Sequence, residues 1–262
     1  MCLIAFAWQK HPRWRLLLAG NRDEFHARLS APLARWDDLP ILGGRDLEAR
    51  GTWLGVTDTG RCCVVTNVRD PRDPQQGTSR GLLATDYLAG AADAVTHAQS
   101  LLDTAANYRP FNLLTFDATH GFYLGNRPTS RAQAIAPGVH GLSNADFNTP
   151  WPKTRALMQR LQAWLDAGDE DNFEPLFDAL ADEKQAPDEA LPETGVGLER
   201  ERWLSSAFIR GELYGTRAST IVAIGHDGSG CVVERRFGPS GRFDGQSELA
   251  LMAQTSGKLP SR

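Results

Sequence analysis

Short apolar runs separated by polar turns recur along the chain of 262 residues. Residues 3–8 and 15–20 form the first pair of runs, and a polar turn that contains Pro12 separates them. Two short apolar runs around turn-forming residues are typical of a β-hairpin. The sequence therefore predicts that the chain begins with a hairpin.

The same pattern predicts further hairpins and one single strand. Asp58 and Gly60 supply turn chemistry in the second hairpin, and Asp227 and Gly228 supply it in the last one. The predicted hairpins are 52–56 with 62–67, 111–117 with 121–124, and 218–224 with 231–237, and the predicted single strand is 138–143.

Helical patterns lie between the first and last hairpins. Leu157, Leu161 and Trp164 recur at the spacing of one helix face. Ser79 has the character of a helix N-cap before an apolar segment. The predicted helices are 79–88, 91–102, 152–165 and 172–180.

Two segments are predicted to lack regular structure. Residues 25–50 are rich in Pro and Arg and contain Gly43-Gly44, a composition that indicates a long irregular stretch. Residues 182–201 are rich in charged residues and contain two prolines and no aromatic residue. We expect this second segment to be a mobile part of the surface.

The order of these elements indicates the fold class. Hairpins at both ends of the chain with helices between them predict an α+β fold with mostly antiparallel sheet. Strands and helices do not alternate, which disfavours a doubly wound parallel sheet. Nothing in the composition marks a boundary, so we expect a single domain over residues 1–262.

Composition and charge narrow the function classes. The chain is 41% hydrophobic and 23% charged with a formal net charge of −4, which is ordinary for a globular protein and gives no footprint for nucleic acid. No signal peptide or transmembrane segment is evident, so we expect a cytoplasmic protein. The four cysteines and six histidines lack metal-ligand spacing, and we expect free thiols, no metal and no cofactor.

Cys2 is the first candidate for chemistry. If Met1 is removed, Cys2 carries a thiol and a free α-amino group on one residue. A thiolate is a strong nucleophile, and a neutral α-amine can accept the thiol proton near neutral pH. This combination is the basis of N-terminal nucleophile catalysis. The alternative is a small apolar residue at the start of a strand.

A polar cluster, Asn21-Arg22-Asp23-Glu24, follows the second apolar run of the first hairpin. Because the ends of two hairpin strands lie near each other, this cluster can reach Cys2. The charged residues would then fix the terminal amine, and Asn21 would hydrogen-bond the substrate. The alternative is a solvated turn.

Other polar residues follow predicted strands in the same way. Asn67 and Asn144 could donate to an oxyanion, although turn-forming asparagines have the same pattern. Arg217 precedes an apolar strand and could clamp a carboxylate or phosphate, or cap the sheet edge. We expect Asn67, Arg69 and Trp53 to contact the substrate.

These motifs together resemble the NRDE family, which includes a eukaryotic transport-and-Golgi-organisation protein. Their order along most of the chain makes the resemblance specific. The motifs are Met1-Cys2, Ala19-Gly20-Asn21-Arg22-Asp23-Glu24-Phe25, Gly43-Gly44-Arg45-Asp46-Leu47, Gly51-Thr52-Trp53-Leu54-Gly55, Thr66-Asn67-Val68-Arg69, Gly141-Leu142-Ser143-Asn144, Pro150-Trp151-Pro152-Lys153 and Tyr214-Gly215-Thr216-Arg217.

The family in turn resembles, more distantly, N-terminal nucleophile hydrolases of the choloylglycine hydrolase type. The resemblance implies an αββα sandwich and action on linear amide bonds. The catalytic residues that it implies are Cys2, Asn21, Arg22, Asp23, Glu24, either Asn67 or Asn144, and Arg217, and of the two asparagines we expect Asn144. The first cluster departs from the hydrolase order Arg-x-x-Asp, because Asn21 stands in place of the Arg and Glu24 in place of the Asp. Arg22 and Asp23 can supply the same charges, but from alternate faces of the strand.

Two function classes are compatible with these residues. The first is an amidohydrolase whose Cys2 attacks an amide or thioester of a small metabolite through an acyl-enzyme. The second is a non-catalytic binding or trafficking protein for haem, lipid or acyl-CoA, which needs an apolar pocket but no reactive thiol. A scaffold for protein partners is a third and weaker possibility.

Overall fold

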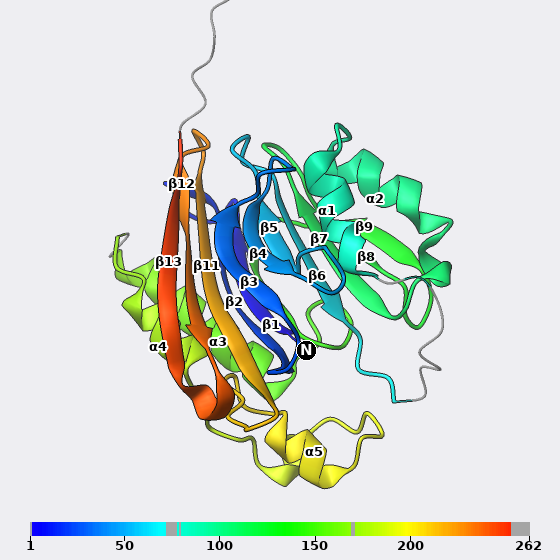
Figure 1. Ribbon diagram of the computed structural model, residues 1–262, viewed down its shortest axis with the longest axis vertical. Helices are drawn as coiled ribbons and strands as arrows, with labels where there is room; N and C mark the ends of the chain where they lie inside the picture. The colour runs from blue at the N-terminus through cyan, green and yellow to red at the C-terminus, as the bar shows by residue number, and fades with distance from the viewer. Residues whose placement is uncertain (1, 72–77, 79, 169–170, 253–262) are drawn as a thin grey trace, which may run out of the picture.

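The computed structural model describes residues 2–71, 78, 80–168 and 171–252. Two antiparallel sheets lie face to face, and helices cover the outer face of each sheet (Figure 1). This arrangement is an αββα sandwich and confirms the predicted fold class. None of the helices in the described part of the chain is long and apolar enough to cross a membrane.

The first sheet brings the two ends of the chain together. Its strand order is β10-β1-β2-β11-β12-β13, and all of its neighbours pair antiparallel. The predicted first and last hairpins are confirmed, and they join through β2 and β11. The bounds are β1 Cys2–Trp8, β2 Trp14–Phe25, β10 Gly138–Leu142, β11 Tyr214–Gly225, β12 Gly230–Phe237 and β13 Phe243–Leu251.

The second sheet follows the chain from one strand to the next. Its order is β3-β4-β5-β6-β7-β8-β9, and it contains the two predicted middle hairpins. The bounds are β3 Ser30–Arg35, β4 Leu42–Asp46, β5 Leu54–Val56, β6 Cys62–Asn67, β7 Phe111–Phe116, β8 Gly121–Gly125 and β9 Arg131–Ala134.

The prediction of an irregular stretch over residues 25–50 is wrong, because β3 and β4 lie within it. The strand β3 is at the edge of its sheet, where Pro32 can be tolerated although it has no N–H to donate. A β-bulge between Ala31 and Ala34 also interrupts its pairing. The apolar alternation that marks a strand is therefore absent here, as it is in the edge strands β9 and β13.

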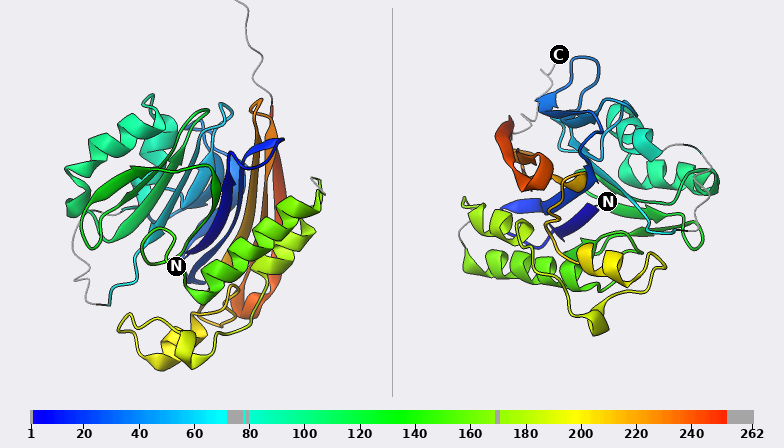
Figure 2. Two further views of the ribbon diagram at one scale, coloured as in Figure 1. Left: turned by 180° about the vertical axis from the view of Figure 1, so that it is seen from behind. Right: turned by 60° about the horizontal axis from the view of Figure 1, so that its bottom comes forward.

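The predicted helices are confirmed, with small differences at their ends. α1 (Leu83–Ala89) and α2 (Ala94–Leu102) cover the second sheet, whereas α3 (Pro152–Ala167) and α4 (Glu174–Leu180) cover the first (Figure 2). The predicted N-cap Ser79 lies outside the described residues. A further helix, α5, spans Leu198–Trp203, and short 3₁₀ helices span Arg80–Leu82, Ala105–Asn107, Asp188–Ala190 and Pro239–Gly241.

Strand alternation distributes the apolar side chains among three cores. Along β1, Ile4 and Phe6 point between the sheets, and Leu3 and Ala5 point toward α3. A third core lies between the second sheet and the helices α1 and α2. The even-numbered residues of β1, Cys2 included, therefore face the space between the sheets.

Residues 182–201 are mostly exposed, as predicted, but the segment is anchored at its end. Glu201 in α5 is only 4% exposed and forms an ion pair with Arg69, which follows β6. The four cysteines are free thiols, as predicted.

Candidate active site

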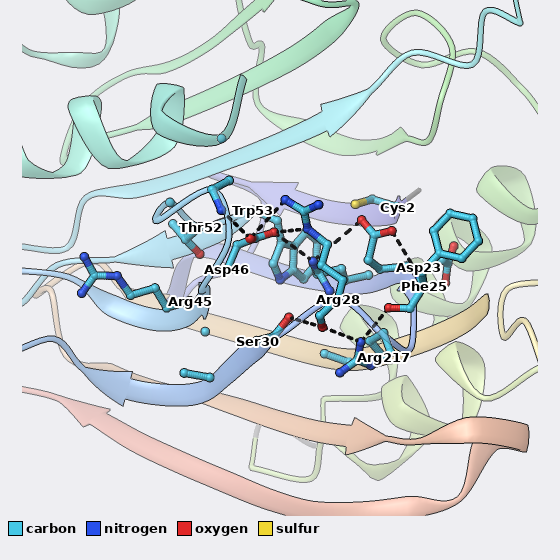
Figure 3. A pocket seen from close by; sticks show the side chains of 18 of the residues that line it. Cys2, Asp23, Phe25, Arg28, Ser30, Arg45, Asp46, Thr52, Trp53 and Arg217 are labelled. Atoms are coloured by element: carbon cyan, nitrogen blue, oxygen red, sulfur yellow. Dashed lines mark hydrogen bonds and ion pairs between the residues drawn. The ribbon is translucent and has the colours of Figure 1, made fainter. Parts of the chain in front are cut away.

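A cleft of about 760 Å³ lies at the start of β1, with residues of both sheets in its walls (Figure 3). Seven of the predicted site residues line it: Cys2, Arg22, Asp23, Glu24, Trp53, Asn67 and Arg217. The predicted residues Asn21, Arg69 and Asn144 are outside its lining. The structure thus gathers most of the predicted site, which is distributed over the chain, around one cleft.

Cys2 is the first residue of β1 and borders the cleft. Its side chain is only 6% exposed. Burial raises the pKa of the Cys2 thiol to about 11, because the charged thiolate loses its solvation. At neutral pH the thiol therefore keeps its proton, and a base close to it is required before it can act as a nucleophile.

Arg22 lies opposite Cys2 in the register of β1 and β2. Arg22 and Glu24 are two residues apart on one strand and share the face that lines the cleft. Arg22 Nη2 is 3.4 Å from Asp46 Oδ2 and 3.9 Å from Glu24 Oε2. The Arg22 guanidinium is thus held beside Cys2 by carboxylates from both sheets.

Asp46, at the end of β4, is itself held by a second arginine. Arg28 Nε donates to Asp46 Oδ2 at 2.6 Å, and Arg28 Nη2 donates to Asp46 Oδ1 at 3.1 Å. Burial acts to raise the pKa of Asp46, but the hydrogen bonds from Arg28 and from the Ala49 N–H lower it overall. The carboxylate stays ionised and orients Arg22, a role that the sequence analysis did not assign to Asp46 or Arg28.

Asn21 has a different position from the one predicted, because it points to the opposite face of β2. Its Nδ2 donates to the carbonyls of Leu180 and Ala207, at 2.8 Å each, and its Oδ1 accepts from Ser219 Oγ at 2.7 Å. The side chain is fully buried and ties β2 and β11 to the helical layer. Its predicted catalytic role is therefore corrected to a structural one.

Asp23 is on the same face as Asn21 but sits closer to the end of β2, where it reaches the cleft. Its Oδ1 accepts a hydrogen bond from Thr216 Oγ1 at 2.8 Å, and only 1% of the residue is exposed. Tyr214 borders the same part of the cleft. Burial and the nearby charges of Asp23 and Glu24 raise the pKa of Tyr214 well above its ordinary value, so its phenol stays neutral.

A chain of hydrogen bonds connects the two predicted asparagines with Cys2. Ser143 Oγ donates to the Cys2 carbonyl at 3.0 Å and to Asn144 Oδ1 at 3.3 Å. Asn144 Nδ2 donates to the Asn67 carbonyl and to Asn67 Oδ1, both at 3.0 Å. Asn144 is fully buried, whereas Asn67 is half-buried and lines the cleft.

Arg217 is the extra residue of a β-bulge in β11. Its Nη1 donates to the carbonyls of Phe25, His26 and Arg28, at 2.9, 3.3 and 3.1 Å. These bonds hold the segment between β2 and β3, which forms one wall of the cleft. In the structure Arg217 Nη1 thus binds backbone carbonyls. The contact with a carboxylate or phosphate of a ligand stays a prediction.

Arg69 lies behind the cleft, where it pairs with Glu201. Arg69 Nη1 is 2.5 Å from Glu201 Oε2, and the two side chains are only 5% and 4% exposed. The guanidinium also lies over the ring of Trp151, with 4.8 Å from Cζ to the ring centroid. This position does not fit the predicted direct contact with substrate, and it makes Arg69 the anchor of α5.

Lys153, in the first turn of α3, is a residue that the sequence analysis did not assign to the site. It is 5% exposed, and its Nζ has no hydrogen-bond partner among the residues that the structure describes. Burial lowers the pKa of Lys153 from 10.5 to about 8, partly opposed by the negative charge of Asp23. Its position in the helix could be predicted from the sequence, but its burial could not.

Lys153→Met is expected to stabilise the protein at neutral pH by about 3 kcal/mol, because it removes a buried charge that the unfolded chain solvates. The folded protein releases this proton near pH 8 and the unfolded chain near 10.5, so the parent gains stability as pH rises between these values. The difference should therefore shrink across that window. Urea unfolding at pH 7 and at about pH 10 checks this, and a variant less stable at pH 7 would contradict it.

No group of three or more His, Cys, Asp or Glu side chains with metal-binding geometry occurs in the part of the chain that the structure describes. The side chains around the cleft are guanidinium, carboxylate, amide, phenol and thiol groups. Their chemistry fits acyl transfer, in which a nucleophile, a base and hydrogen-bond donors are required.

The fold is shared with two solved structures. The chain matches a Caenorhabditis elegans N-acylethanolamine-hydrolyzing acid amidase ortholog with a TM-score of 0.52 and 9% identity, over 84% of this chain and 92% of that one. It matches the C2A mutant of conjugated bile acid hydrolase from Clostridium perfringens with a TM-score of 0.50 and 9% identity, over 95% and 92%. The chain therefore shares its αββα fold with these two hydrolase structures.

The family is defined by sequence. The model of the family described as Transport and Golgi organisation 2 matches residues 1–239, and the chain belongs to this family. The Transport and Golgi organization protein 2 homolog of Homo sapiens is 33% identical over 259 residues, which cover 90% of this chain and 92% of the relative. These matches confirm the family resemblance predicted from the ordered motifs.

Proposed function

We propose that the chain is an N-terminal cysteine amidohydrolase that cleaves an amide C–N bond, or a thioester, of a small metabolite. One observation carries the proposal: Cys2 begins a central strand and borders a cleft that is large enough for a small molecule. The two structures that share the fold, an acid amidase ortholog and a conjugated bile acid hydrolase, support hydrolysis as the class of reaction.

The reaction would begin once Met1 is removed. The α-amine of Cys2 takes the thiol proton, and Sγ attacks the carbonyl carbon of the substrate. The tetrahedral intermediate collapses when the C–N bond breaks, and the proton held by the amine passes to the leaving nitrogen. Water then attacks the acyl-Cys2 thioester, gives its proton to the same amine and releases the acid, and Sγ regains a proton.

Asn67 is the better candidate for the oxyanion donor. Asn144 Nδ2 donates both of its hydrogens to Asn67. Asn144 therefore positions Asn67 and has no N–H left for an oxyanion. Asn67 Nδ2 has only a 3.5 Å contact with the Val68 carbonyl, which is too long for a strong hydrogen bond. Asn67 also faces the cleft, so its amide can turn toward a developing oxyanion.

Asn67→Ala is expected to lower kcat for a hydrolysed amide by about 10²–10³-fold with a small change in KM, because an oxyanion donor acts mainly in the transition state. Asn67→Asp is a matched variant of the same size whose charge would oppose the oxyanion. Stopped assays with fluorogenic N-acyl amides and acyl thioesters measure both. A KM effect alone would assign Asn67 to substrate binding.

A binding protein for haem, lipid or acyl-CoA is the alternative, and one observation favours it. Seven arginines and five acidic residues are among the described residues that line the cleft, although the whole chain has a net charge of −4. Trp53 and Phe237 add apolar surface beside these charges. An anionic group on an apolar ligand would be complementary to such a cleft.

Cys2 separates the two functions. A binding protein should keep its affinity for a haem, fatty-acid or acyl-CoA probe in Cys2→Ser, whereas the hydrolase should lose turnover in the same variant. Titration calorimetry with each probe and the amide assay are performed on one preparation. Retained binding without turnover by the parent would favour the binding protein.

A further inference from the structure

The buried Lys153 ammonium, in the first turn of α3, is not used in the reaction described above. The first turn of α3 is pressed against β10: a Cβ on Gly141 would lie 2.4 Å from Thr154 Cγ2. β10 pairs with β1 through Ile4 and Leu142, and Ser143 contacts the Cys2 carbonyl. The α3 N-terminus is therefore next to the residue that the proposed function makes the nucleophile.

Two features make a lysine at this position destabilising. A lysine that is retained at such a cost indicates a functional role. A positive charge in the first turn of a helix is repelled by the helix dipole, and α3 has no acidic residue in that turn. A buried ammonium without a hydrogen bond is costly, and Lys153 Nζ has none within the described part of the chain. An apolar side chain of similar length would fill the same space without either cost.

Asp23 acts electrostatically on both the Lys153 ammonium and the Cys2 thiol, and Arg22 and Glu24 also act on that thiol. Asp23 on β2, Arg69 after β6, Cys2 on β1 and Glu201 on α5 are the groups whose charges act on the ammonium. Arg69 and Glu201 neutralise each other in their ion pair. Asp23 follows Arg22, the register partner of Cys2, so its backbone runs beside the start of β1.

We propose that Lys153 is a positioning residue whose ammonium keeps the thiol–amine pair of Cys2 singly deprotonated, and so reactive, at neutral pH. The inference rests on the proposed function, because it concerns the free amine of residue 2. A pair with a protonated amine and a neutral thiol carries one positive charge, and a nearby cation favours loss of its first proton. The proton goes to solvent, and no bond to Lys153 forms.

The alkylation of Cys2 by iodoacetamide, followed between about pH 5 and pH 9 by mass spectrometry of the N-terminal peptide, tests this role. In Lys153→Met the profile should move up by about one pH unit, so that alkylation at pH 7 is about tenfold slower. Lys153→Arg keeps a charge and should retain the parent profile. Lys10→Gln removes the same charge from an exposed turn and is the matched control.

The outcomes separate this inference from the proposed function. Overlapping profiles for Lys153→Met and the parent would overturn the role of Lys153 and leave the nucleophile in place. A shifted profile without any amide turnover would support Lys153 and count against the hydrolase. Absence of alkylation at Cys2 in every variant would overturn both. Circular dichroism confirms that each variant is folded before its profile is compared.

Discussion

Cys2→Ala is expected to abolish amide turnover, with a loss of at least about 10³-fold, because Cys2 carries the only thiol among the described residues that line the cleft. Cys2→Ser replaces the thiol by a much less acidic hydroxyl and should retain only a small fraction of the activity. The measurement is kcat/KM for a hydrolysed N-acyl amide, together with the mass of any covalent intermediate.

Cys231→Ala is the control for this experiment. Cys231 is a half-buried thiol on β12 that is absent from the lining of the cleft, and burial raises its pKa to about 11, as it does for Cys2. Its removal should leave turnover unchanged. Equal loss of activity in the Cys2 and Cys231 variants would indicate a general effect of thiol removal and contradict a role for Cys2 as nucleophile.

Arg69→Met is expected to destabilise the protein by about 3–5 kcal/mol, because it leaves the Glu201 carboxylate buried without its counter-ion. Glu201 Oε1 would keep the hydrogen bonds from the Thr194 N–H and hydroxyl, which cannot neutralise its charge. The backbone N–H of Arg69 also donates to the backbone carbonyl of Asn144 at 2.7 Å. Loss of the ion pair should therefore disturb the asparagines of the site as well.

Arg202→Met is the matched control, since Arg202 is the neighbour of Glu201 in α5. It pairs with Asp188 at 2.7 Å, but the two side chains are 41% and 50% exposed. An exposed ion pair contributes little to stability because solvent screens its two charges. Urea unfolding of both variants measures the difference, and equal effects would mean that α5 is not anchored by Arg69.

Most interior strands could be predicted from the sequence, whereas most edge strands could not; the interior strand β4 was missed because its residues 42–46 are mostly glycine and charged. In β1, β2 and β11 nearly all residues are buried, so their apolar runs stand out. In β3 and β13 only one residue each is fully buried, and no apolar run marks them. Edge strands face solvent, and their polar residues are indistinguishable from those of a loop.

The membership of the site was easier to predict than the direction of its side chains. The motif Asn21 to Glu24 is continuous in sequence, but strand alternation sends Arg22 and Glu24 to the cleft and Asn21 to the helical layer. The register between β1 and β2 decides which residues of the motif face the cleft. The length of the turn in the first hairpin fixes this register.

Residues that act through burial were beyond sequence reasoning. A lysine in the first turn of a helix is usually exposed to solvent. Lys153 is buried because α3 closely approaches β10. Glu201 ends a segment whose other residues are mostly exposed. Their environment is set by contacts between elements that are distant along the chain.

The mass of the chain after treatment with an acylating β-lactone tests whether Cys2 is an N-terminal nucleophile. The expected product lacks Met1 and carries a single acyl group, which tandem mass spectrometry assigns to Cys2 and which is absent from Cys2→Ala. A chain that retains Met1, or a label distributed over Cys62, Cys63 and Cys231 with none on Cys2, would contradict the proposed mechanism.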